Sequence, residues 1–242
     1  MKLFLLLFVF VTSVFAEVGM PALEKADGKH VFIFFYRDKN ERTVRAEKVF
    51  DGVAEKVDSS FVKVQVNDPS ETIVKKFGLE RSPMPFVMVF APNGAVTGGF
   101  SNFSEQQLMN SFVSQGMAKC LKGLQDKKLV FLCLQNAKTS GNDAALKGVN
   151  DFKADERFAN ATEIVKIDPT DRNEQTFLNQ LAVENAGEAT TVFIAPPAET
   201  IGQYKGATDK ERFISDLQNA VSGCCGPGGC CPGGCCPGGS CK

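Results

Sequence analysis

The sequence has almost no excess of charge, a single histidine and only one long hydrophobic run. Its 27 basic and 28 acidic residues leave a net charge of −1, and the basic residues are scattered, so no nucleic-acid partner is expected. His30 stands at the start of a predicted strand without an evident partner, which argues against a Ser–His or Cys–His catalytic pair. No closely spaced pair of carboxylates stands out. The common signatures of hydrolytic catalysis are therefore missing.

The one long hydrophobic run lies at the N-terminus. Lys2 precedes an apolar stretch from Leu3 to Phe15, and Ala16 fits a small-residue cleavage site, so residues 1–16 are predicted to be a secretory signal peptide. A membrane anchor is the alternative, but the run is short and charged residues follow it closely. We therefore expect a mature chain without a membrane span, exported to a periplasmic or extracellular location where disulfides persist.

An internal repeat of about a hundred residues organises the mature chain. Val31–Tyr36 is a continuous apolar run, and residues 130–135 repeat it in the second half. Both runs predict a strand buried on both faces. Further matched strands are predicted over residues 61–66 and 163–167, and matched hairpins over residues 86–100 and 191–206.

Helices are predicted between these strands and at the end of each half. Residues 46–57 have apolar side chains at helical spacing, and the matching stretch 143–158 is weaker. The Asp-Pro steps at residues 68–69 and 168–169 are predicted to start the next helix of each half.

Capping boxes at Ser104 and Thr208 predict the helix that closes each half, and the first of these two helices is expected to end near Gly116. The fold class is therefore α/β, with a central mixed sheet flanked by helices in each half.

This element order resembles the thioredoxin fold in both halves. The best match is Met84-Pro85-Phe86, because a cis-proline precedes the corresponding strand in the thioredoxin family. The resemblance implies two tandem thioredoxin-like domains, over residues 17–117 and 118–222. It also implies a peptide-binding surface at Met84, Pro85 and Phe86. In the second half, Thr190 takes the position of the proline.

The paired cysteines of thioredoxin-family redox enzymes are absent. The matching positions are about Asn40 to Thr43 in the first half and residues 138–142 in the second, and neither stretch contains cysteine. We therefore predict no catalytic residue in either domain. Cys133, in a predicted strand, is expected to be buried. Three alternatives remain for Cys120. It is an exposed and reactive thiol, a thiol that pairs with the C-terminal tail, or an isolated thiol at a helix end.

Seven of the nine cysteines are concentrated in residues 223–242, a Cys-, Gly- and Pro-rich tail that is predicted to be disordered. Soft thiolates select Cu(I), Zn or another thiophilic ion, and two cysteine pairs supply the four sulfurs of a tetrahedral site. Disulfide bonding is the alternative, because spacing alone does not separate ligands from disulfides. The candidate metal or disulfide residues are Cys224, Cys225, Cys230, Cys231, Cys235, Cys236 and Cys241.

The function predicted from the sequence is an exported, non-catalytic scaffold or binding protein with a protein or peptide partner, whose tail binds soft metal ions. The alternatives are thiol-disulfide exchange by the tail, or cross-linking to the cell envelope through intermolecular disulfides. The odd number of cysteines requires at least one thiol that is free, metal-bound or joined to another molecule.

Overall fold

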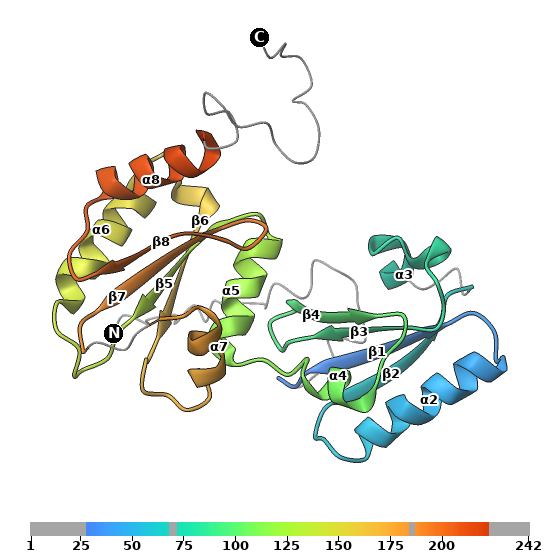
Figure 1. The fold of residues 1–242 in the computed structure, drawn as a ribbon. Coiled ribbons are helices and arrows are strands. Elements are labelled where there is room, and N and C mark those ends of the chain that lie inside the picture. The colour runs from blue at the N-terminus through green and yellow to red at the C-terminus, as the bar shows by residue number, and fades with distance from the viewer. Residues whose placement is uncertain (1–27, 68–71, 184–186, 223–242) are drawn as a thin grey trace, which may run out of the picture. The chain divides into compact units, whose positions relative to one another are not determined.

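The computed structural model describes residues 28–67, 72–183 and 187–222. The chain divides between Val113 and Ser114 into two compact units, here called the first and second units (Figure 1). The predicted boundary between residues 117 and 118 falls inside a helix of the second unit. No helix in the described part of the chain is long and apolar enough to cross a membrane.

The first unit has one four-stranded mixed sheet with the strand order β2-β1-β3-β4. β1 is parallel to β2 and antiparallel to β3, so Ile33 lies between Val62 and Met88. Its elements are β1 (Val31–Tyr36), α2 (Glu41–Ala54), β2 (Ser60–Gln65), α3 (Thr72–Lys76), the 3-10 helix η2 (Leu79–Arg81), β3 (Phe86–Phe90), β4 (Val96–Phe100) and α4 (Glu105–Met109).

The second unit repeats this arrangement of strands, and a helix, α5, precedes its first strand. Its sheet has the order β6-β5-β7-β8, with β5 parallel to β6 and antiparallel to β7. Its elements are α5 (Gln115–Gln125), β5 (Leu129–Leu134), α6 (Asn142–Ala154), the 3-10 helix η3 (Ala159–Ala161), β6 (Thr162–Ile167), α7 (Gln175–Gln180), β7 (Thr190–Ala195), β8 (Glu199–Lys205) and α8 (Lys210–Ser222).

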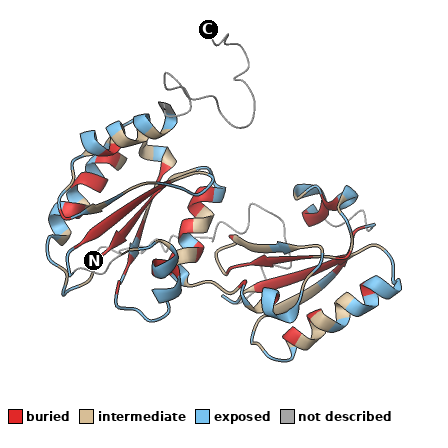
Figure 2. Cartoon of the chain, in the orientation of Figure 1, coloured by how far each residue is buried: buried red, intermediate tan, exposed pale blue. Residues whose placement is uncertain are grey.

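Each sheet is buried on both faces at its central strands, as the apolar runs predict (Figure 2). In the first unit, alternate residues of β1 and β3 pack against α2 and α4 on one face and against α3 on the other. In the second unit, α6 and α8 cover one face, while α5 and α7 cover the other. The mixed sheet with flanking helices is thus confirmed in both halves.

The closing helix of the first half is shorter than predicted. Ser104 and Gln107 form the predicted capping box, but α4 ends at Met109. The chain then enters α5, where Ser114 caps the helix by accepting a hydrogen bond from the Met117 amide. The expected helix ending near Gly116 is therefore wrong, because that glycine belongs to the first turn of the next helix.

The Asp168-Pro169 step does not start a helix. The Asp168 carboxylate accepts hydrogen bonds from the amide and the hydroxyl of Thr170, which stabilise a turn, and α7 begins only at Gln175. The corresponding Asp68-Pro69 step lies outside the described residues.

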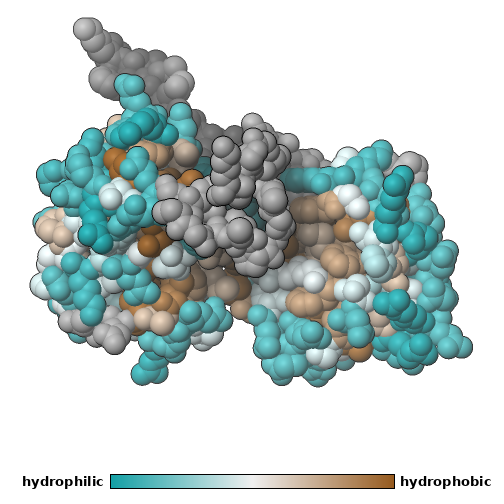
Figure 3. Space-filling model, turned by 45° about the horizontal axis from the view of Figure 1, so that its top comes forward, coloured by the Kyte–Doolittle hydropathy of each residue, from teal (hydrophilic) through white to brown (hydrophobic). Residues whose placement is uncertain are grey.

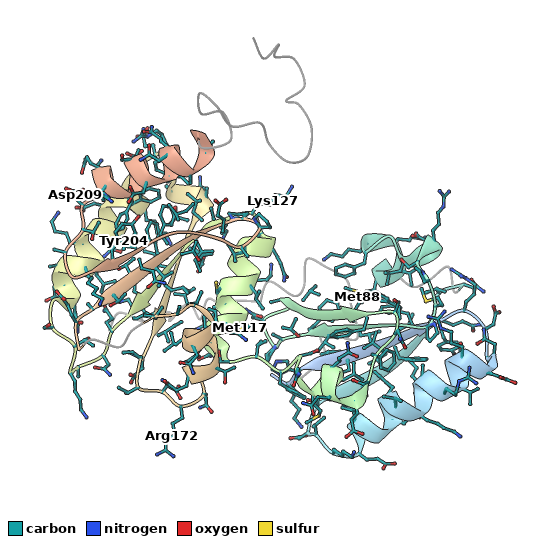
Figure 4. The ribbon with its side chains drawn as sticks, viewed as in Figure 1. Met88, Met117, Lys127, Arg172, Tyr204 and Asp209 are labelled. Atoms are coloured by element: carbon teal, nitrogen blue, oxygen red, sulfur yellow. The ribbon has the colours of Figure 1, made fainter. Side chains whose placement is uncertain are left out.

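The last helix is capped one residue later than predicted. The Arg212 amide donates a hydrogen bond to the side chain of Asp209, at the start of α8 (Figure 4). Asp209 therefore takes the capping role that was predicted for Thr208.

A buried carboxylate holds the start of α5 in the second unit. Glu174 is only 6% exposed, and it accepts hydrogen bonds from the Ser114 hydroxyl and the Gly116 amide. A negative charge at a helix N-terminus is favourable, and here it also satisfies a backbone donor that the helix leaves free. A side chain at Gly116 would meet the Glu174 carboxylate at 2.6 Å, so this contact requires a glycine.

Candidate functional site

A groove of about 460 Å³ in the first unit lies beside Pro85. One wall is a stripe of α2 residues at helical spacing, Arg42, Arg45, Ala46 and Val49, and the other includes Phe103 from the loop between β4 and α4. The volume is within the range typical of ligand sites in proteins. Its lining combines four apolar residues, Ala46, Val49, Pro85 and Phe103, with the two guanidinium groups, an arrangement suited to a ligand with both apolar and anionic parts.

The three predicted binding residues are divided between the two faces of the sheet. The Met84–Pro85 peptide bond is cis, as the resemblance implies, and Pro85 lines the groove. The side chains of Met84 and Phe86 pack instead against the core on the α3 side, because successive residues along an extended segment point to opposite faces. Of the three side chains, the structure therefore brings only Pro85 to the groove.

The two arginines differ in how they are held. Arg42 donates a hydrogen bond of 3.1 Å to the Ser101 carbonyl, which links α2 to the loop after β4. Arg45 forms an ion pair with Glu41, in which the side chains are 72% and 91% exposed. Such an exposed pair contributes little to stability, so the Arg45 guanidinium remains available to a ligand. Arg42 is also exposed, and its hydrogen bond to a neutral carbonyl leaves its charge in place.

The N-terminus of α2 has no thiol. The Asn40 side chain accepts from the Thr43 amide at 3.0 Å and caps the helix. Thr43 itself is buried. These two residues occupy the region where a redox enzyme of the thioredoxin family would carry its cysteines. The groove therefore lies beside a helix N-terminus that carries no thiol.

The corresponding region of the second unit is a self-contained polar cluster. The Asn136 amide group donates to Asp168 at 2.8 Å, and Asn142 donates to the Asn136 carbonyl at 2.7 Å. Hydrogen bonding to Thr170 and Asn136 lowers the pKa of Asp168. Thr190, at the position of the proline, is buried. The polar groups of this cluster form hydrogen bonds with one another, so we assign the cluster a structural role.

The two cysteines of the described residues are buried in the second unit. Cys120 lies in α5 and Cys133 in β5, and they pack into cores on opposite faces of the sheet. Burial raises the pKa of the Cys120 thiol to about 11 and that of Cys133 to about 12. The expected burial of Cys133 is confirmed, and Cys120 is the isolated thiol rather than the exposed one. Neither thiol is activated for exchange.

The remaining candidates fall outside any site in the described residues. The half-buried His30 ring accepts a long hydrogen bond from the Val113 amide and contacts Phe112, and burial lowers its pKa. The seven tail cysteines lie outside the described residues, within which no cluster of three or more potential metal ligands occurs. Val44 and Val221 are the exposed large hydrophobic residues of the described chain, so most of the apolar colour in Figure 3 comes from partly buried side chains.

The arginines of the groove could not be identified as ligand-binding residues from the sequence. Ala46 and Val49 belong to the apolar stripe that predicts α2, and Arg45 belongs to its polar face. The structure leaves Ala46 and Val49 half-buried at the groove, while Phe50 and Val53 are fully buried beneath them. The sequence does mark Arg42 as unusual, because it places a positive charge in the first turn of a helix, where a negative charge is preferred. This feature alone does not identify a ligand-binding residue.

No protein-family model matches the chain, and no curated protein matches it significantly. Among solved structures, a thioredoxin pre-protein from Schistosoma mansoni is 26% identical over 41% of this chain and 85% of that chain, with a TM-score of 0.32. Spinach chloroplast thioredoxin f is 17% identical over 39% and 78%, with a TM-score of 0.30. The zinc-bound form of human ERp44 is 11% identical over 80% of this chain and 56% of that chain, with a TM-score of 0.34.

The strand topology of the two units carries the assignment of the fold. Each sheet has a parallel first pair of strands, an antiparallel hairpin at its other edge and helices on both faces. The chain therefore consists of two tandem domains with the thioredoxin-like fold, and neither has the paired cysteines of the redox enzymes.

Proposed function

We propose that this chain is an exported, non-catalytic binding protein whose first unit holds an extended polypeptide in the groove beside Pro85. The observation that carries the proposal is the groove itself, which has apolar lining residues next to a helix N-terminus that has no thiol. Binding there requires no chemistry from the protein, only complementary shape, apolar contact and polar groups at the rim. Pro85 also restricts Met84, the residue before it, to an extended conformation, which suits pairing with an extended ligand backbone.

A variant that fills the groove tests this proposal. Asn102 lines the groove and is exposed, so Asn102→Trp should obstruct the site without unfolding the domain. On an array of short synthetic peptides, we expect the mature chain to bind a subset and Asn102→Trp to lower that signal about tenfold, the loss typical of an important contact.

The matched control is Asn160→Trp, at another exposed asparagine, in η3 of the second unit, which should leave the signal unchanged. Equal binding by wild type and Asn102→Trp would show that the groove is not the peptide site.

We further propose that the C-terminal tail binds soft metal ions. Its seven cysteines are separated only by Gly, Pro and one Ser, so thiols are the only metal ligands among its side chains, and Gly-Pro turns allow successive pairs to approach a shared centre. The two buried cysteines of the second unit are poor ligands by comparison, since only the thiolate binds metal and their pKa values are raised.

The number of metal ions that the protein retains tests this second proposal. The reduced mature chain, loaded with Cu(I) or Zn²⁺ and dialysed, should retain several ions per chain, and a chain ending at residue 223 should retain almost none. Equal metal content in the two chains would contradict it. The cross-linking alternative would be supported instead by few free thiols before reduction, together with high-mass species that a reductant converts to monomers.

A further inference from the structure

We infer that the groove beside Pro85 selects a polypeptide that carries an acidic side chain two residues from an apolar one. This inference rests on the proposed peptide-binding function of the groove and adds the chemical class of its partner. It follows from the two arginines of the groove, from its apolar lining residues and from the spacing between them along α2.

The rim of the groove is positively charged and is not neutralised from within. Arg42 and Arg45 line the groove, and none of its lining residues is a carboxylate. The hydrogen bond of Arg42 goes to the neutral Ser101 carbonyl, so its full charge remains. The only acidic partner of Arg45 in the described residues is the exposed Glu41, and a ligand carboxylate can compete for so weak a pair.

The position of the arginines along α2 strengthens this preference for an anion. Arg42 is in the first turn, where the free amide groups and the helix dipole already contribute positive potential. A cation at this place works against the stability of the helix, and residues that break a local rule of this kind are expected at functional sites. The positive charges at the rim therefore favour a negatively charged ligand.

The spacing of the wall fits an extended chain. Arg42 lies four residues before Ala46, and Arg45 lies four residues before Val49. Four residues of helix rise by about 6 Å, and two residues of an extended peptide by about 6.7 Å. A peptide lying along α2 can thus place an acidic side chain at the arginines while the residue two positions away reaches Ala46 or Val49.

Two peptides of equal shape test this selectivity. The first contains Asp-Thr-Leu-Thr-Asp and the second contains Asn-Thr-Leu-Thr-Asn, each with a fluorescent label for anisotropy measurements on the mature chain. We expect the acidic peptide to bind about tenfold more tightly at low salt, as charge-assisted contacts are stronger than neutral ones. The preference should disappear near 1 M salt, where the screening length is about 3 Å.

Arginine variants identify the source of the preference. Arg42→Gln and Arg45→Gln should each lower the preference about threefold, and the double variant should remove it. Arg81→Gln, an exposed arginine of η2 that does not line the groove, is the matched control and should keep it.

The outcomes separate the two proposals. Equal binding of the two peptides, with binding still reduced by Asn102→Trp, would overturn the charge selectivity and leave the groove as a peptide site. A preference that survives the double arginine variant would also overturn it. No binding of either peptide, together with no effect of Asn102→Trp on the peptide array, would overturn both proposals.

Discussion

Gly148→Ala should destabilise the second unit by about 2 kcal/mol, although alanine is the better helix former. Gly148 lies in α6 at the closest approach of that helix to the segment before α8. An added Cβ would lie 1.6 Å from the Thr208 carbonyl oxygen and 2.8 Å from its carbon. Because the obstacle is backbone, the two segments must separate, and overpacking of this kind costs about 1–3 kcal/mol or more. The intrinsic preference of helices for alanine recovers only about 1 kcal/mol.

A glycine-to-alanine substitution in α2 provides a control, because it should raise the stability of its unit. A Cβ added at Gly52 would have no atom within 4 Å, and this glycine lies within a helix, so Gly52→Ala should stabilise the first unit by about 0.5–1 kcal/mol. Denaturant unfolding followed by circular dichroism measures both changes. A Gly148→Ala variant as stable as wild type would contradict the close packing of α6.

The strands and the repeat could be predicted because their signals are local. The apolar runs of β1 and β5 have no polar residue at their centres, and both prove to be buried on two faces. Asn40 and Ser104 cap α2 and α4 through contacts three residues apart, which a sequence pattern can reveal.

The errors have two different physical causes. The Asp168-Pro169 step has the composition of a helix start, but the Asp168 carboxylate accepts hydrogen bonds from Thr170 in a local turn, and helix α7 begins only at Gln175. The start of α5 depends instead on a contact between Ser114 and Glu174, which are 60 positions apart in the sequence. This helix was not predicted because its residues read as a junction between domains.

The groove could be predicted only in part, for a related reason. Pro85 follows from the resemblance to thioredoxin, but its neighbours in space come from α2 and from the loop around Phe103. Whether Ala46 and Val49 are covered depends on how far that loop closes over α2, and helical periodicity carries no information on this point.

Thiol reactivity should divide the nine cysteines into two sharply different groups. In the reduced, folded chain, Cys120 and Cys133 are buried and their pKa values are raised to about 11 and about 12. Each pKa unit lowers the thiolate fraction at neutral pH about tenfold, and burial also excludes the reagent. The seven tail cysteines have no large neighbours in sequence that could bury them, so we expect seven fast thiols and two that react only on unfolding.

The proposed function requires this separation between folded domains without active thiols and a tail that concentrates the thiols. The most direct measurement is made on a reduced mature chain that ends at residue 223. With a chromogenic disulfide reagent we expect no fast thiol, two thiols after unfolding, and no reduction of insulin. A fast-reacting thiol in this folded, truncated chain, or reduction of insulin by it, would contradict the account.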